Sequence, residues 1–207
     1  YDANKVTLTN TASGVINLTG DESTGIYAKR GLITNDGQIS VGKKSTGIYI
    51  VEDDRSPVAA TVGAKATNDS TGVITIGEES TGMFYKVVPD NADGKGTNTG
   101  ISGGLANAGK IESTANNVIA MSFDSPYANK TYRNESTGVI DLQGQNSTGM
   151  FATGAGAYTA HNDGTIKLAS STNVNAPNIG MYAEEIQITA APAPKTTLVT
   201  LENNGTI

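Results

Sequence analysis

The feature that most constrains this chain is an internal repeat that returns every 25 to 41 residues. A copy opens with an asparagine and continues as Gly-x-Ile-x-Leu or a close variant, and four of the copies end in Ser-Thr-Gly followed by Ile or Met and an aromatic residue. Residues 35–50 show the pattern in full. The anchoring asparagines are Asn10, Asn35, Asn68, Asn107, Asn134, Asn162 and Asn203. Such a repeat indicates a stacked architecture, because one copy cannot bury its own apolar face.

The spacing of the anchors limits the kind of repeat protein. Successive anchors are 25, 33, 39, 27, 28 and 41 residues apart. The short spacings suit one coil of a parallel β-solenoid and are too short for a propeller blade of roughly 40–45 residues. The excess in the long spacings predicts inserts at 51–66, 86–100, 169–178 and 184–197. We therefore expect a single β-solenoid over residues 1–207, about six coils that form a fragment of a longer chain.

Each copy predicts three short strands and hence an all-β fold. Alternate residues of a strand point to opposite faces, which places Ile16 and Leu18, with their equivalents, inward. A second strand follows each Ser-Thr-Gly, and a weaker third strand precedes each asparagine. Three strands per coil fit the three faces of a triangular β-helix.

The anchoring asparagine is expected at a turn, for two physical reasons. Asparagine tolerates tight turns and bonds its own backbone there. Stacked asparagine amides also bond to the copies above and below, as in cross-β ladders. The glycine that follows two to four residues later is expected to occupy a corner with positive φ.

Composition and motifs offer little for catalysis. Fourteen basic residues against twenty acidic ones give a net charge of −6, which argues against nucleic-acid partners. The absence of cysteine excludes disulfides and thiolate metal sites. His161, the single histidine, is expected to be a surface turn residue, and residues 90–94 resemble half a calcium loop without its closing Glu. We expect no catalytic residue, no metal and no cofactor.

Two features are candidates for contacts with a partner. Loops on a rigid scaffold commonly carry binding, so the inserts contribute one set. These insert candidates are Asp53, Asp54, Arg55, Asp90, Asn91, Asp93 and Lys95. If Ile26 and its equivalents face inward, alternation places the following rings outside as a stacked stripe. These rings, the aromatic row, are Tyr27, Tyr49, Phe84, Phe151 and Tyr182. The opposite arrangement, with the rings inward, remains open at this point.

Tandem blocks of Asn-x-Gly-x-Ile-x-Val-Gly-x-x-Ser-x-Gly-Ile-Tyr-Ala resemble the passenger regions of very large autotransporter adhesins of the fusobacterial type. The resemblance covers nearly the whole chain apart from the inserts and the degenerate copy at Asn107. It implies a right-handed parallel β-helix that is exported through an outer-membrane barrel outside this fragment and displayed on the bacterial cell surface. It also implies that the segment is the stalk or the binding part of a non-catalytic adhesin, which attaches to a host-cell surface protein or glycan, or to another bacterium. The absence of cysteine agrees, because a disulfide would trap a chain crossing the periplasm unfolded.

The alternative is a β-helical polysaccharide lyase or hydrolase, or a phage tailspike fragment. Such enzymes need two or three carboxylates converging on one face. Asp21, Glu22, Glu78 and Glu79 instead fall in expected turns. In either case we expect a monomer or weak end-to-end association through open strand edges. No apolar run approaches the roughly 20 residues that span a bilayer, so no direct membrane insertion of this fragment is expected.

Overall fold

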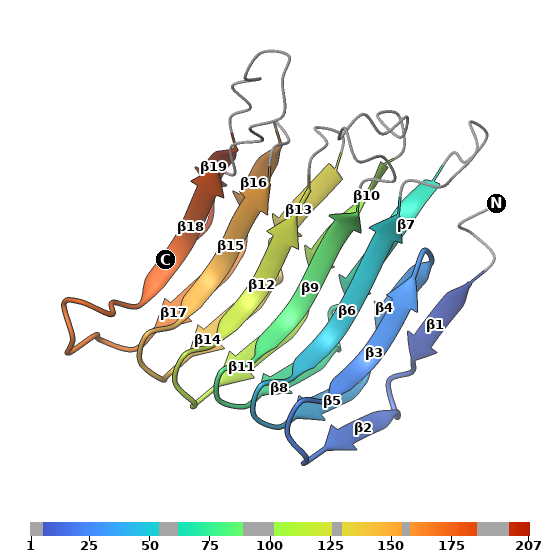
Figure 1. Ribbon diagram of the computed structural model, residues 1–207, viewed down its shortest axis with the longest axis horizontal. Helices are drawn as coiled ribbons and strands as arrows, with labels where there is room; N and C mark the ends of the chain where they lie inside the picture. Colours follow the sequence, from blue (N-terminus) through green and yellow to red (C-terminus); the bar gives the residue numbers. More distant parts are fainter. Residues whose placement is uncertain (1–5, 54–61, 89–101, 126–129, 155–157, 186–198) are drawn as a thin grey trace.

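The computed structural model describes residues 6–53, 62–88, 102–125, 130–154, 158–185 and 199–207 (Figure 1). Within these ranges the regular elements are strands, and they form three sheets whose paired strands all run parallel. The chain visits the three sheets in the same order in each coil, so that β1 and β19 lie at opposite ends of the stack (Figure 1). The predicted all-β parallel solenoid is confirmed.

Each sheet collects one strand from each coil. The Asn sheet, in which each strand ends on an anchoring asparagine, contains β1 (Thr7–Asn10), β4 (Leu32–Asn35), β7 (Val62–Asn68), β10 (Ser102–Asn107), β13 (Lys130–Asn134), β16 (Thr159–Asn162) and β19 (Thr200–Asn203). The Ile sheet contains β2 (Val15–Leu18), β5 (Gln38–Val41), β8 (Val73–Ile76), β11 (Lys110–Ser113), β14 (Val139–Leu142) and β17 (Thr165–Leu168). The aromatic sheet contains β3 (Thr24–Lys29), β6 (Thr46–Asp53), β9 (Thr81–Val88), β12 (Ile119–Asp124), β15 (Thr148–Gly154) and β18 (Ile179–Glu185).

The core lies between the three sheets and consists of side chains stacked from coil to coil. The central ladder of the Ile sheet is at most 1 % exposed and comprises Ile39, Ile74, Ile111, Ile140 and Ile166. Ile16 at one end of the ladder is partly buried. Ile207 at the other end is 57 % exposed, although it lies against Gly180 just as Ile74 lies against Gly47. The predicted inward ladder is therefore confirmed, and exposure at its ends reflects the lack of a covering coil in the structure.

The seven asparagines form a continuous ladder along one corner. Each is in register with the next, and each Nδ2 donates to the Oδ1 of the following asparagine at 2.7–2.8 Å. The five inner members, from Asn35 to Asn162, are fully buried. The predicted amide ladder is confirmed, and it passes the long spacings without a break because the inserts leave the coil elsewhere.

The expected reason for the corner glycines is wrong. Among described glycines, positive φ occurs only at Gly104 and Gly154, which lie outside this corner. Gly37 is required by space instead, because a Cβ there would lie 2.3 Å from the carbonyl oxygens of Gly14 and Thr11. Positive φ recurs at non-glycine residues in the turn between the Ile and aromatic sheets, namely Glu22, Lys44, Glu79, Asn117 and Asn146.

The strands extend further into three of the predicted inserts than the repeat indicates, and in the fourth insert β18 continues to Glu185. β6 continues to Asp53 and β7 resumes at Val62, while β9 continues to Val88 and β10 begins at Ser102. Residues 169–178 lie between β17 and β18, outside any strand, as predicted. Most of the fourth insert, from residue 186 on, lies outside the described residues. A search of the described part of the chain finds no helix that could span a membrane.

Candidate functional site

The aromatic row lies on the outer face of the aromatic sheet. Its rings occupy one register position, with Tyr27 beside Tyr49 and Tyr49 beside Phe84. The preceding residue of each strand points into the core, as Ile48, Met83 and Met150 do at 0 % exposure. Tyr27 and Tyr182, at the two ends of the row, are 52 % and 42 % exposed. The structure thus places the rings outward, and the open alternative of an inward ladder for this set is wrong.

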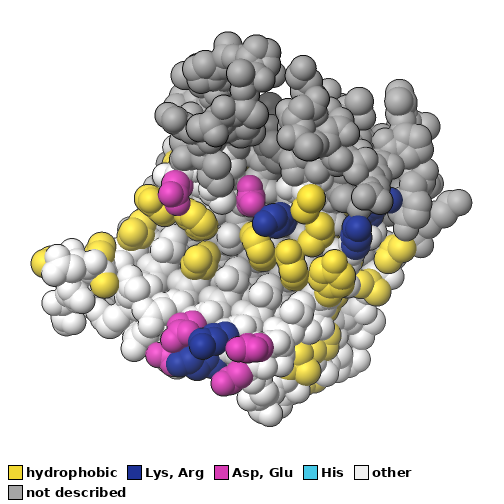
Figure 2. Space-filling model, in the orientation of Figure 1, with side chains coloured by type: hydrophobic (Ala, Val, Ile, Leu, Met, Phe, Trp, Pro, Cys, Tyr) yellow, Lys and Arg dark blue, Asp and Glu magenta, His cyan; other side chains and the backbone are white. Residues whose placement is uncertain are grey.

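The row is divided into two stacks of rings. Tyr49 and Phe84 stack nearly parallel with centroids 5.0 Å apart, and Tyr27 meets Tyr49 edge-on at 5.4 Å. Phe151 and Tyr182 form the second stack, also at 5.4 Å. Ser122 of the degenerate copy stands between the stacks, in register with Phe84 and Phe151. Figure 2 looks onto this face and shows hydrophobic side chains forming a band across the strands.

A rim of mixed charge borders the row, two residues further along each strand. Lys29, Lys86, Asp124 and Glu184 occupy this outward position in four of the six coils. Lys86 Nζ lies 4.0 Å from a carboxylate oxygen of Asp124. Partial burial raises the pKa of Asp124, and the charge of Lys86 opposes that shift. Burial likewise raises the pKa of the Tyr49 hydroxyl, with a smaller contribution from neighbouring Tyr27.

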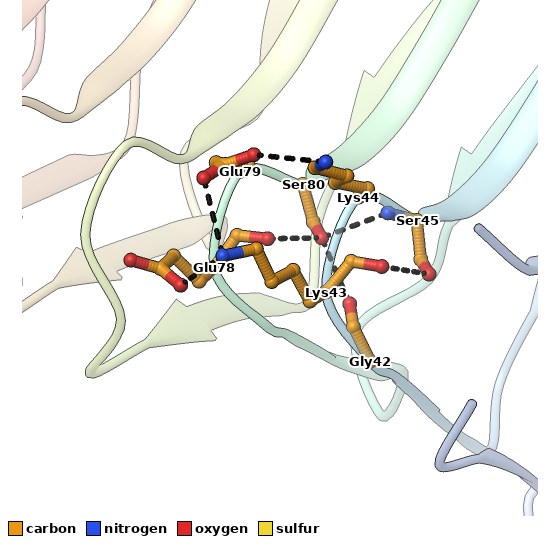
Figure 3. A network of polar contacts seen from close by, with 7 residues as sticks. All are labelled: Gly42, Lys43, Lys44, Ser45, Glu78, Glu79 and Ser80. Atoms are coloured by element: carbon orange, nitrogen blue, oxygen red, sulfur yellow. Dashed lines mark hydrogen bonds and ion pairs between the residues drawn. The ribbon is translucent and has the colours of Figure 1, made fainter. Parts of the chain in front are cut away.

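Two of the turn acids, Glu78 and Glu79, form ion pairs at the corner between the Ile and aromatic sheets (Figure 3). Lys43 Nζ lies 2.8 Å from Glu78 and 3.3 Å from Glu79, and Lys44 Nζ lies 3.9 Å from Glu79. Hydrogen bonds to the two glutamates raise the pKa of Lys43. Beneath them, the Ser80 hydroxyl accepts a hydrogen bond from the Ser45 backbone N–H at 2.9 Å. These carboxylates therefore serve the corner and do not face one another across an open surface.

The insert candidates are not brought together by the described structure. Asp53 is the last residue of β6. The remaining insert candidates, Asp54, Arg55, Asp90, Asn91, Asp93 and Lys95, lie outside the described residues. Their role in binding stays a prediction.

The sequence predicted that His161 lies in a surface turn, and this prediction is wrong. The residue lies on strand β16 with a partly exposed side chain, in register with Arg133 and Glu202. Its Nδ1 lies 3.3 Å from Glu202 Oε2. Arg133 also pairs with Asp163, whose pKa is lowered mainly by a hydrogen bond from Asn204 and further by Arg133. The histidine belongs to a small polar cluster on the Asn sheet.

Sequence reasoning missed a second, internal set of aromatic rings. Tyr85, Phe123 and Tyr132 stack with centroids 4.9 Å apart, and Tyr158 meets Phe123 edge-on. The first three are fully buried. The sequence did contain a signal for these rings. One inward position of the aromatic sheet holds a smaller residue such as Ala28 in other coils, but holds Tyr85 in β9 and Phe123 in β12.

No metal centre is evident in the part of the chain that the structure describes, where no three His, Asp or Glu side chains gather in a way that could hold an ion. Comparison with known proteins does not assign the chain to a family. No protein-family model matches the chain, and no curated protein or solved structure matches it either.

Proposed function

We propose that this chain is a segment of a surface-displayed bacterial adhesin, which attaches the cell to host cells or to other bacteria without catalysis. The observation that carries the proposal is the outward aromatic row on a stacked β-scaffold. The repeat pattern, which resembles autotransporter passengers, supports display on the cell surface. The proposed partner is a surface protein or glycan on the opposing cell.

The row has the properties of a contact surface. Aromatic residues are enriched at protein interfaces, because one ring supplies a large apolar area with few rotatable bonds. From Tyr27 to Tyr182 the row crosses five steps between coils, which corresponds to roughly 24 Å at about 4.8 Å per step. The charged rim around Lys86 and Asp124 adds polar groups that can orient a partner. A rigid sheet holds all these groups in fixed register.

The test is binding of the purified, labelled 207-residue chain to host epithelial cells and to bacterial cells. The variant replaces three rings with serine, Tyr27→Ser, Tyr49→Ser and Phe84→Ser, since serine already occupies this row at Ser122. We expect bound chain to fall roughly tenfold or more, because a few aromatic residues usually account for most contact energy.

The matched control removes three outward valines from the Ile sheet, Val15→Ser, Val73→Ser and Val139→Ser. This control should bind as the unaltered chain does. Equal binding by the ring variant and the control, with both folded, would contradict the aromatic row as the contact surface. Absence of binding by the unaltered chain to every cell type would contradict a direct attachment role for this segment.

A further inference from the structure

A buried polar cluster joins three coils near the corner between the aromatic sheet and the Asn sheet. It consists of Glu52 near the end of β6, Tyr85 on β9 and Lys130 at the start of β13. Lys130 Nζ lies 2.8 Å from Glu52 Oε1, and the Tyr85 hydroxyl donates to Glu52 Oε2. The side chains of Lys130 and Glu52 are 0 % and 6 % exposed. An amine and a carboxyl group 78 residues apart are thus held in contact away from water.

A glycine in the intervening coil makes this contact possible. Gly103 of β10 is in register with Lys130, directly between the two coils. A Cβ at Gly103 would lie 2.8 Å from the Tyr85 hydroxyl, 3.0 Å from Glu52 Oε2 and 2.5 Å from the Ala64 carbonyl oxygen. The missing side chain leaves the space in which the lysine crosses a coil to reach the glutamate.

The surroundings exclude water from the pair. Tyr85 stacks on Phe123, and both rings are fully buried. Transfer of one proton from the ammonium to the carboxylate would leave a neutral amine beside a neutral acid, the two forms that can condense. Burial, with the nearby Glu52 charge, raises the pKa of Tyr85 well above its ordinary value, so its hydroxyl remains a donor.

We propose that Lys130 and Glu52 form an intramolecular isopeptide bond. After the proton transfer, the lone pair of Lys130 Nζ attacks Cδ of Glu52, and the new N–C bond forms as the C=O π bond opens. The Tyr85 O–H stabilises the negative charge that develops on Oε2. The Oε1 hydroxyl leaves as water after it takes a proton from Nζ, and the C=O bond re-forms. The products are one amide and one water, with no change in oxidation state.

The arrangement supplies what this condensation needs. The reacting groups are already in hydrogen-bond contact, and holding two reactants in place replaces a collision between separate molecules. Exclusion of water removes the medium that would favour the reverse hydrolysis. The amide would also replace two buried charges with one neutral group. It would link coils covalently in a chain that has no cysteine for disulfides.

The test is the intact mass of the folded, purified 207-residue chain, followed by proteolytic mapping. The expected mass is lower than that of the linear sequence by one water molecule, and mapping should yield a branched peptide that joins Glu52 to Lys130. A folded chain with the full sequence mass and no branched peptide would overturn the proposal. The mapping uses the unaltered chain, so it does not depend on whether a variant folds.

Three variants sharpen the assignment. Lys130→Arg keeps the positive charge but removes the nucleophilic amine, so its mass should equal that of its linear sequence. Glu52→Gln should release ammonia in place of water and reach the same final mass as the unaltered chain. Tyr85→Phe keeps the ring stack and should slow the mass change in a time course after refolding. The same loss of water in folded Lys130→Arg would place the reaction elsewhere and overturn the proposal.

Discussion

At the scale of single residues, the asparagine corner depends on groups that satisfy one another. Asn107 accepts from Asn68 and donates to Asn134, both at 2.8 Å, and it is fully buried. Removing its amide leaves a buried donor and a buried acceptor without their partners, which is more costly than losing an exposed hydrogen bond.

We therefore predict that Asn107→Ala lowers the free energy of unfolding by about 2–6 kcal/mol, the sum for two buried groups left unpaired. Urea denaturation followed by circular dichroism measures the change. The control is Asn175→Ala at an exposed position, which should change stability by less than about 0.5 kcal/mol. Similar effects of the two substitutions would show that the ladder contributes little.

The corner glycines give a second prediction at this scale. Gly37→Ala should destabilise by about 1–3 kcal/mol, because its Cβ would overlap two carbonyl oxygens at 2.3 Å. Gly20→Ala is the matched control, since the nearest atom to its Cβ is Ser23 Oγ at 3.9 Å. Equal midpoints for the two variants in chemical denaturation would contradict the steric explanation.

The residue scale also shows what a repeat in the sequence can and cannot reveal. Seven asparagines in one register predicted the amide ladder, because stacking follows directly from the repeat. The recurring glycine showed that this position needs a residue without a side chain. A positive φ and a lack of space both select glycine, so the sequence alone does not distinguish them. The distances around Gly37 distinguish the two explanations.

At the scale of strands, the aromatic sheet has an interruption that can be filled. Ser122 separates the ring stack ending at Phe84 from the stack beginning at Phe151. Ser122→Phe should join the stacks and stabilise the chain by about 1 kcal/mol, since each aromatic pair contributes roughly 0.5–1.5 kcal/mol. The control is Ser40→Phe on the Ile sheet, whose neighbours in register are Asn17 and Thr75. A gain in unfolding midpoint at Ser40 but not at Ser122 would contradict the ring geometry.

The same sheet carries a prediction about pH. Because burial raises the pKa of Asp124 in the folded state, ionisation of this carboxyl opposes folding. Its favourable contribution exists below the unfolded pKa of 3.8 and is lost as pH rises through the folded value. Asp124→Asn should therefore raise the melting temperature at pH 7 relative to the unaltered chain, and this advantage should disappear below about pH 3.8. A constant difference between the two chains across this range would contradict the assignment.

Strand positions were predictable from the sequence to the extent that the repeat is regular. The alternation in residues 15–18 and its copies fixed which side chains enter the core. The contact between Glu52 and Lys130 was not predictable, because the neighbouring coil has Gly103 where this one has Lys130, and 78 residues separate the lysine from the glutamate. Contacts that break a repeat depend on which coils become neighbours and on the space a glycine such as Gly103 leaves.

At the scale of the whole molecule, the described part of the chain has terminal strands at both ends of the stack, and most of them pair on one side only. Among the described residues, β1, β2 and β3 form one end, and β18 and β19 lie at the other, where Thr206 forms a bridge to Thr165 of β17. Unpaired edges can template another chain, so we expect weak end-to-end association that grows with concentration in sedimentation velocity. Leu201→Lys on β19 should reduce it, whereas Thr75→Lys, in the middle of the Ile sheet, should leave it unchanged. An unchanged sedimentation coefficient at all concentrations would argue against open ends.

The central claim is that the aromatic row faces solvent while the residues before it fill the core. Two adjacent substitutions test it most directly, Met150→Asp and Phe151→Asp in β15. Met150 is fully buried, so a carboxylate there should abolish the cooperative thermal transition, because an unpaired buried charge costs several kcal/mol. Phe151→Asp should retain the transition with a modest loss of stability. The reverse result, with Phe151→Asp unfolded and Met150→Asp folded, would place the rings inside and contradict the account.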